Sequence, residues 1–145
     1  MSIDEFPRKR SAAGVLFARH KEILIVKPTY SEKWLIPGSV VEAGESPRGA
    51  AERDCVEEIG IRPRISGLLV VDYRDSDAIH FIFEGHLEDY ANININRREI
   101  ERFSWESIST ASELLEDHLA KRVIASIQAI TLGKPVYCEN GEILT

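Results

Sequence analysis

The sequence predicts an α/β fold, a sandwich in which helices cover a mixed β-sheet. Runs of β-branched and aromatic residues recur along the chain, and only two segments, one short and one long, have the apolar spacing of a helix. Strands lie on both sides of the short helix and precede the long one, which is not the order of a regular βαβ array. With 145 residues, 43% of them hydrophobic, the chain is expected to form one domain over residues 1–145.

The N-terminal part predicts a β-hairpin. Residues 11–18 and 23–27 are apolar and rich in β-branched side chains, and the residues between them are polar. A short apolar segment follows at 34–36. It ends at Pro37 and Gly38, a pair that favours a turn.

The best-defined helix lies between Ser46 and Gly60. Ser46 is a favourable N-cap, Pro47 suits the first helical position, and Gly60 suits the left-handed residue that follows the last turn. Apolar side chains recur every four residues at Ala51, Cys55 and Ile59. This spacing predicts one buried face for the helix.

The C-terminal part predicts three further strands, a long helix and a hairpin. The strands are expected at 65–73, 78–87 and 99–107, where apolar and aromatic residues are frequent. The long helix is expected over 112–132, where a Gly and then a Pro follow its last turn. An Asn-Gly pair at the centre of residues 136–144 favours a tight hairpin turn.

The composition limits the partners of the chain. It carries 24 acidic and 18 basic residues, a net charge of −6, which argues against a nucleic-acid polymer as the partner. Nothing approaches the roughly 18 consecutive apolar residues of a membrane helix, so no membrane partner is expected. The two cysteines lie far apart, as in a reduced protein, and the N-terminus has no apolar leader, so the expected location is cytoplasmic. Exposed strand edges would permit a homodimer.

Most of the negative charge lies in residues 42–58. This segment holds six acids against two arginines, Arg48 and Arg53, and so carries −4 of the net −6. The acids are Glu42, Glu45, Glu52, Asp54, Glu57 and Glu58.

Three of these acids, Asp54, Glu57 and Glu58, fall within an arc of about 100° on the predicted helix, away from its apolar face. Carboxylates this close repel one another, and the helix dipole disfavours the two in the last turn. Arg53 compensates part of this charge. A divalent cation with oxygen ligands, Mg²⁺ or Mn²⁺, would compensate more, and a solvated acidic surface is the alternative.

Residues 39–61 resemble the Nudix box of Nudix hydrolases, G-x5-E-x7-R-E-U-x-E-E-x-G-U, in which U is aliphatic. The positions that match are Glu45, Arg53, Glu57, Glu58, Gly60 and Ile61. Ser39 stands at the first glycine of the box, Asp54 at the glutamate after the arginine, and Cys55 at an aliphatic position. The resemblance implies a Nudix-type α/β/α sandwich around the mixed sheet.

The resemblance also implies a metal site with a set of ligands. Glu57 and Glu58 would be the principal ligands, Asp54 a weaker or water-mediated third, and the carbonyl of Gly38 a further one. Family members often use another acid shortly before a late tryptophan-containing strand. Glu99 fits that position as a ligand or base.

The remaining matched residues would support this site. Arg53 and Glu45 would form a bridge that orients the loop and the helix. Glu101 competes with Glu99 for the late acidic position, and Glu99 could equally be an ordinary surface carboxylate.

Nudix hydrolases cleave a nucleoside diphosphate linked to another moiety, X, by attack of water on one phosphorus of the diphosphate. The resemblance therefore implies a Mg²⁺-dependent hydrolase, with Mn²⁺ as an alternative metal. The substrate would be a small nucleotide-like diphosphate: a nucleotide sugar, ADP-ribose, a dinucleoside polyphosphate or a nucleoside triphosphate. Glu57, Glu58 or Glu99 would accept the proton. The alternative, suggested by Ser39 and Asp54, is a catalytically weakened nucleotide-binding or regulatory module.

The sequence does not single out a substrate within these classes. Side chains that could stack on a base or contact a phosphate are Lys27, Tyr30, Trp34, Tyr73 and His80. For each of them the alternative is an ordinary place in the core or on the surface, and Trp34 in particular is expected in the core.

Overall fold

The β-sheet of this computed structural model contains parallel and antiparallel pairs, as the sequence predicts. The structure describes residues 2, 5–76, 78–88 and 92–144. The strands in these ranges are β1 (Arg10–Arg19), β2 (Glu22–Pro28), β3 (Gly38–Val40), β4 (Arg64–Tyr73), β5 (Ala78–His86), β6 (Ile100–Ser107), β7 (Val136–Glu139) and β8 (Glu142–Ile143). They form one sheet in the order β6-β2-β1-β5-β4-β7-β8, with β3 paired to β1. β1 is parallel to β5 and β4 to β7, whereas the other pairs are antiparallel.

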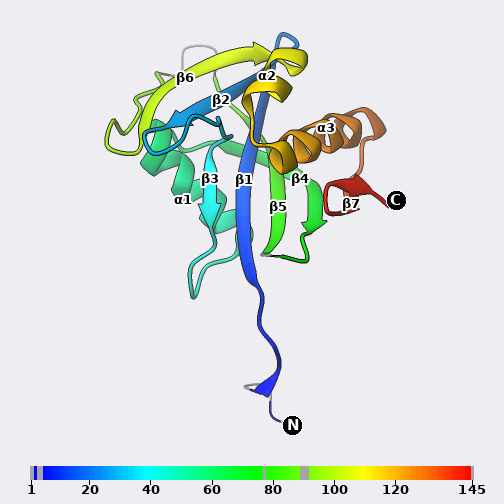
Figure 1. Cartoon of the computed structure of the whole chain (residues 1–145). Helices are drawn as coiled ribbons and strands as arrows, with labels where there is room; N and C mark the ends of the chain where they lie inside the picture. Colours follow the sequence, from blue (N-terminus) through cyan, green and yellow to red (C-terminus); the bar gives the residue numbers. More distant parts are fainter. Residues whose placement is uncertain (1, 3–4, 77, 89–91, 145) are drawn as a thin grey trace.

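Helices cover both faces of this sheet, which makes the fold an α/β/α sandwich (Figure 1). Helix α1 (Pro47–Ile59) packs on one face, and α2 (Ile108–Leu114) and α3 (Asp117–Leu132) pack on the other. Along β1, Val15 and Phe17 join the core under α1, whereas Leu16 joins the core under α3. Since both faces are buried, this strand is a continuous apolar run rather than an alternating one.

The prediction of one helix over 112–132 is wrong, because the structure divides this region into α2 and α3. The break lies at Leu115 and Glu116, where the backbone of Trp34 intervenes: its N–H donates to the carbonyl of Leu114 at 3.0 Å. The Glu116 carboxylate then accepts hydrogen bonds from the first amides of α3 and acts as its N-cap. A glutamate inside an apolar helical pattern gives little sign of this cap, since side-chain N-caps are more often Ser, Thr, Asp or Asn.

Both predicted hairpins are confirmed. His20 and Lys21 connect β1 to β2 with φ of 53° and 64°, and Asn140 and Gly141 connect β7 to β8 with φ of 49° and 83°. Positive φ at both central residues matches the right-handed twist of the adjoining strands. None of the helices in the described ranges combines the length and the apolar character needed to cross a membrane.

Candidate active site

The caps predicted from the sequence hold α1 at both ends. The Ser46 hydroxyl accepts a hydrogen bond from the N–H of Gly49 at 3.0 Å, and Gly60 ends the helix with a φ of 70°. The apolar side of the helix is fully buried at Ala50, Ala51, Cys55 and Ile59. This packing fixes the rotation of the helix and turns its acidic positions toward the loop that precedes it.

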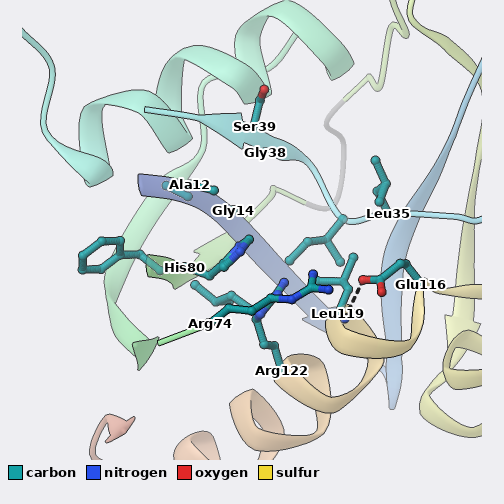
Figure 2. Close-up of a pocket in the computed structure, with 14 residues that line it drawn as sticks. Ala12, Gly14, Leu35, Gly38, Ser39, Arg74, His80, Glu116, Leu119 and Arg122 are labelled. Carbon is teal, nitrogen blue, oxygen red and sulfur yellow. Dashed lines mark hydrogen bonds between the residues drawn. The ribbon is translucent and has the colours of Figure 1, made fainter. Parts of the chain in front are cut away.

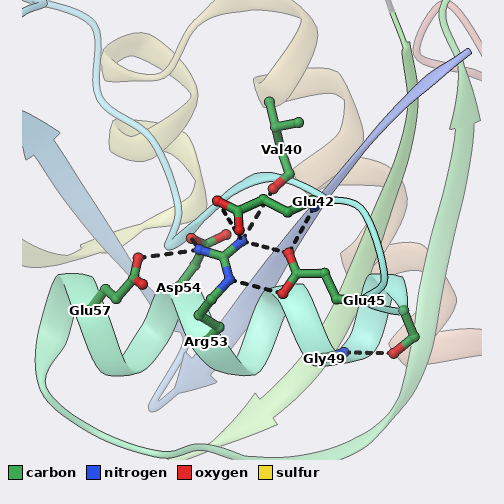
Figure 3. Close-up of polar contacts among 8 residues, drawn as sticks. Val40, Glu42, Glu45, Gly49, Arg53, Asp54 and Glu57 are labelled. Atoms are coloured by element: carbon green, nitrogen blue, oxygen red, sulfur yellow. Dashed lines mark hydrogen bonds and ion pairs between the residues drawn. The ribbon is translucent and has the colours of Figure 1, made fainter.

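Arg53 joins that loop to the helix (Figure 3). Its guanidinium binds Glu45 through two hydrogen bonds, Nε to Oε2 at 2.9 Å and Nη2 to Oε1 at 2.7 Å. Its Nη1 also contacts Asp54 Oδ1 at 3.0 Å and Glu57 Oε2 at 3.2 Å, and Nη2 donates to the carbonyl of Val40 at 3.3 Å. The hydrogen bond from Arg53 lowers the pKa of Glu45 to about 2. The pair is therefore fully ionised at neutral pH and ties the loop to the helix.

Two carboxyl groups of α1 are buried beside this network. Asp54 is 2% exposed and Glu58 is 8% exposed, whereas the side chain of Glu57 is 51% exposed. Burial, together with the charge of Asp54, raises the pKa of Glu58 to about 8. Burial also raises the pKa of Asp54 to about 6, although Arg53 opposes that shift. The Oδ2 atom of Asp54 has no hydrogen-bond partner within the described residues. Glu58 has no cationic partner among the described ion pairs, and Asp54 shares its partner, Arg53, with Glu45 and Glu57. The charge of one guanidinium therefore does not compensate these carboxylates when all are ionised.

Gly38 lies in strand β3 and not in a turn, which corrects the sequence-based expectation for the Pro37-Gly38 pair. Its N–H faces Glu58 Oε1 at 3.4 Å. A Cβ at Gly38 would lie 2.4 Å from the carbonyl oxygen of Ala13 and 2.5 Å from the Cα of Gly14, so only glycine allows this strand to approach β1. Ser39 is not among the residues with positive φ, so its side chain causes no backbone strain at the first position of the box.

The structure places Glu99, and not Glu101, beside the acidic helix. Glu99 and Glu58 line one cavity of about 390 Å³ together with Gly38 and Ser39. The loop before Glu99 is attached to the end of α1, where the N–H of Asn96 donates to the carbonyl of Glu58 at 3.0 Å. Glu101 instead forms an ion pair at 2.5 Å with the buried ammonium group of a lysine on β2.

The chemistry of these groups suits a hard divalent cation. The donors are oxygens, two of the carboxyl groups are buried near one another, and the free Oδ2 of Asp54 adds an available donor. Among the described residues, however, no three His, Cys, Asp or Glu side chains are close enough to hold a metal as they stand. Glu57 is turned to Arg53.

The five candidate substrate contacts have different surroundings. Tyr30 is 79% exposed and lines the acidic cavity. Trp34 belongs to the core, as expected, and Lys27 is buried in its ion pair with Glu101. The ammonium of Lys9 lies 4.8 Å from the centre of the Tyr73 ring.

The fifth candidate, His80, lines a second cavity of about 220 Å³ between the sheet and α3 (Figure 2). Arg74 and Arg122 lie in the wall of the same cavity, and neither was identified from the sequence. Arg122 could have been found, because it is a charged residue directly before a buried valine on the apolar side of the predicted helix. Arg74 follows a strand and has no distinguishing spacing.

Within the α/β/α sandwich, the acidic helix α1 lies against the preceding loop, which Arg53 holds through Glu45. This arrangement defines the class of Nudix-fold proteins. Solved structures share the architecture. A UDP-X diphosphatase superposes with a TM-score of 0.76 at 18% identity, over 92% of this chain and 68% of that chain. An ADP-ribose pyrophosphatase from Streptococcus suis superposes with a TM-score of 0.73 at 13% identity, over 91% of this chain and 99% of that chain. At these identities the likeness establishes the fold.

Sequence similarity identifies the family. The profile of the NUDIX domain matches residues 7–126. Diphosphoinositol polyphosphate phosphohydrolase 3-alpha of Mus musculus is 32% identical over 120 residues, which cover 76% of this chain and 71% of that protein. The chain therefore belongs to the Nudix family of hydrolases, which act on diphosphate bonds and generally use divalent metals.

Proposed function

We propose that this chain is a Mg²⁺-dependent pyrophosphohydrolase that cleaves the diphosphate linkage between a nucleoside diphosphate and a second moiety, X. The observation that carries the proposal is the pair of buried carboxyl groups, Asp54 and Glu58, beside a cavity that Glu99 also lines. Burying two such groups is costly when their one neighbouring cation among the described ion pairs, Arg53, is shared with Glu45 and Glu57, and a divalent cation supplies the missing charge. The resemblance to enzymes of diphosphate-containing substrates, including ADP-ribose and diphosphoinositol polyphosphates, supports the same reaction class.

In this reaction a water oxygen forms a bond to one phosphorus while the bridging P–O bond breaks. The leaving phosphate takes the electron pair of that bond, and a carboxylate accepts the proton from water. Glu57, Glu58 and Glu99 are the candidates for this acceptor. Arg53 holds the loop and the helix in register, so that Gly38 stays against Glu58. Bound Mg²⁺ would neutralise the diphosphate oxygens and lower the pKa of the attacking water.

The test is product release from a panel of nucleotide sugars, ADP-ribose, dinucleoside polyphosphates, nucleoside triphosphates and diphosphoinositol polyphosphate. Each is assayed with Mg²⁺, with Mn²⁺ and with a chelator. We expect metal-dependent cleavage that the double substitution Glu57→Gln with Glu58→Gln abolishes without unfolding the protein. Glu52→Gln is the matched control, because Glu52 lies on the same helix and pairs only with Arg48 and Arg62 among the described ion pairs.

The panel also separates the enzyme from a catalytically weakened binding module. Asp54 is one methylene shorter than the glutamate of the box, and Arg53 already holds its Oδ1 atom. A binding module would show thermal stabilisation by members of the panel with no product at any concentration of Mg²⁺ or Mn²⁺. Turnover that the double substitution leaves unchanged would refute the proposed metal site.

A further inference from the structure

The second cavity lies next to the acidic one. Gly38 and Ser39 line both, so the two cavities meet at strand β3. A substrate whose diphosphate lies at the carboxylates of α1 would therefore extend past β3 into the space between the sheet and α3. The volume of about 220 Å³ suits one part of such a substrate, because pockets for whole drug-sized ligands span about 300–1,000 Å³.

The wall of this cavity carries two arginines. The side chains of Arg74 and Arg122 point toward one another between β5 and α3 (Figure 2). The rest of the wall is largely apolar and includes Phe81, Ile82 and Leu119, but Glu116 also lines it. In such surroundings a charge-assisted hydrogen bond is less screened than in water.

Two carboxylates that interact with Arg122, those of Asp72 and Glu116, also accept hydrogen bonds from backbone amides. Asp72 accepts from Arg122 Nε at 2.7 Å through Oδ2 and from the N–H of Gly141 at 2.9 Å through Oδ1. Glu116 caps α3 and accepts from the amides of His118 and Leu119 at 3.0 and 3.1 Å. Arg122, whose side chain is only 6% exposed, retains a buried Nη2 with no hydrogen-bond partner in the described part of the chain.

We propose that this second cavity binds an anionic group, a phosphate ester, on moiety X of the substrate through Arg74 and Arg122. This inference rests on the proposed function, because the diphosphate at α1 sets the orientation of X. The oxyanion would satisfy the free Nη2 of Arg122 after a small side-chain movement, since that atom has no contact with solvent. Arg74 is half-buried.

The test compares substrates that differ by one phosphate. ADP-ribose 1″-phosphate carries a single phosphate on its terminal ribose, which is moiety X, and ADP-ribose lacks it. Diphosphoinositol polyphosphate is the third arm, which distinguishes a cyclitol phosphate from a nucleotide phosphate. We expect kcat/KM to be about tenfold or more higher for the phosphorylated member of the pair than for ADP-ribose, because one charge-assisted hydrogen bond is worth roughly 10- to 100-fold. If the phosphate is that of a cyclitol, diphosphoinositol polyphosphate should show the same increase over ADP-ribose.

Arg74→Gln is the informative variant, because Arg122→Gln would leave Asp72 without its buried counter-charge and could unfold the protein. The ratio of kcat/KM for the phosphorylated substrate to kcat/KM for its unphosphorylated partner should fall toward one in Arg74→Gln, mainly through a change in KM. Arg64→Gln is the matched control, since Arg64 is exposed at the other end of β4, and it should keep the preference.

The outcomes separate this inference from the proposed function. Absence of turnover on every substrate with either metal refutes the proposed function, and the inference with it. Turnover with no preference for phosphorylated substrates refutes the anionic subsite and leaves the hydrolase intact. A preference that survives Arg74→Gln has the same consequence, because the phosphate is then recognised elsewhere.

Discussion

Replacing Glu58 by glutamine should stabilise the metal-free protein above neutral pH. The carboxyl of Glu58 has a pKa of about 8 in the folded protein, raised by burial and by Asp54 from the ordinary value of 4.5. The folded state therefore holds a proton that the unfolded state releases, and stability decreases as pH rises from 4.5 toward 8. While the group is ionised only in the unfolded chain, the free energy of unfolding decreases by about 1.4 kcal/mol per pH unit. Integrated between pH 6 and pH 8, the decrease in the free energy of unfolding is about 2 kcal/mol.

The measurement is urea or thermal unfolding in a chelator from pH 5 to pH 9. In the wild-type protein, 2 kcal/mol corresponds to a decrease in Tm of roughly 5–8 °C for a chain of this size. In Glu58→Gln the decrease in Tm between pH 6 and pH 8 should be much smaller than in wild type, because the amide stays neutral. Glu52→Gln, on the same helix, should keep the wild-type slope. Equal slopes in wild type and Glu58→Gln would refute the assignment of Glu58 as the buried acid that titrates here.

Four other substitutions examine separate parts of the site. Arg53→Lys replaces two parallel hydrogen bonds by a point charge, so kcat/KM should fall by about 10- to 100-fold, and an unchanged value would show that the loop anchor is dispensable. Gly38→Ala forces a Cβ to within 2.4 Å of the neighbouring backbone, so urea unfolding should show a loss of about 2–4 kcal/mol. Glu99→Gln should lower kcat by about 10²-fold or more, whereas Glu101→Gln should lower it far less; the reverse order in steady-state assays would exchange their roles.

The sequence predicted the elements whose signals are local. Helix α1 could be placed because Ser46, Pro47 and Gly60 each act within one turn, and their caps form as expected. The turn at Asn140-Gly141 depends only on the backbone freedom of two residues. The division between α2 and α3 could not be predicted, because it requires the backbone of Trp34, which is distant in sequence.

The same distinction applies to the site. The contacts of Arg53 with Glu45 and Glu57 follow from box spacing and helix geometry, and they are present. The burial of Asp54 and Glu58 depends on how the loop and the segment before β6 close over the helix, which spacing alone does not show. The pairing of Glu101 with a buried lysine separates it from Glu99 only once β2 and β6 lie side by side.

The hydrogen bonds of Arg53 suggest how a cation can enter without loosening the loop. Arg53 holds Glu45 through two bonds of 2.7 and 2.9 Å, whereas its single contact with the half-exposed Glu57 is 3.2 Å. A cation held by Glu57 would therefore replace this longer contact and would leave the anchor to Glu45 intact. The same movement would bring Glu57 toward Glu58 and Asp54, and a cation there would favour ionisation of these two buried carboxyl groups. Arg53 would thus hold the loop in register both before and after the metal binds.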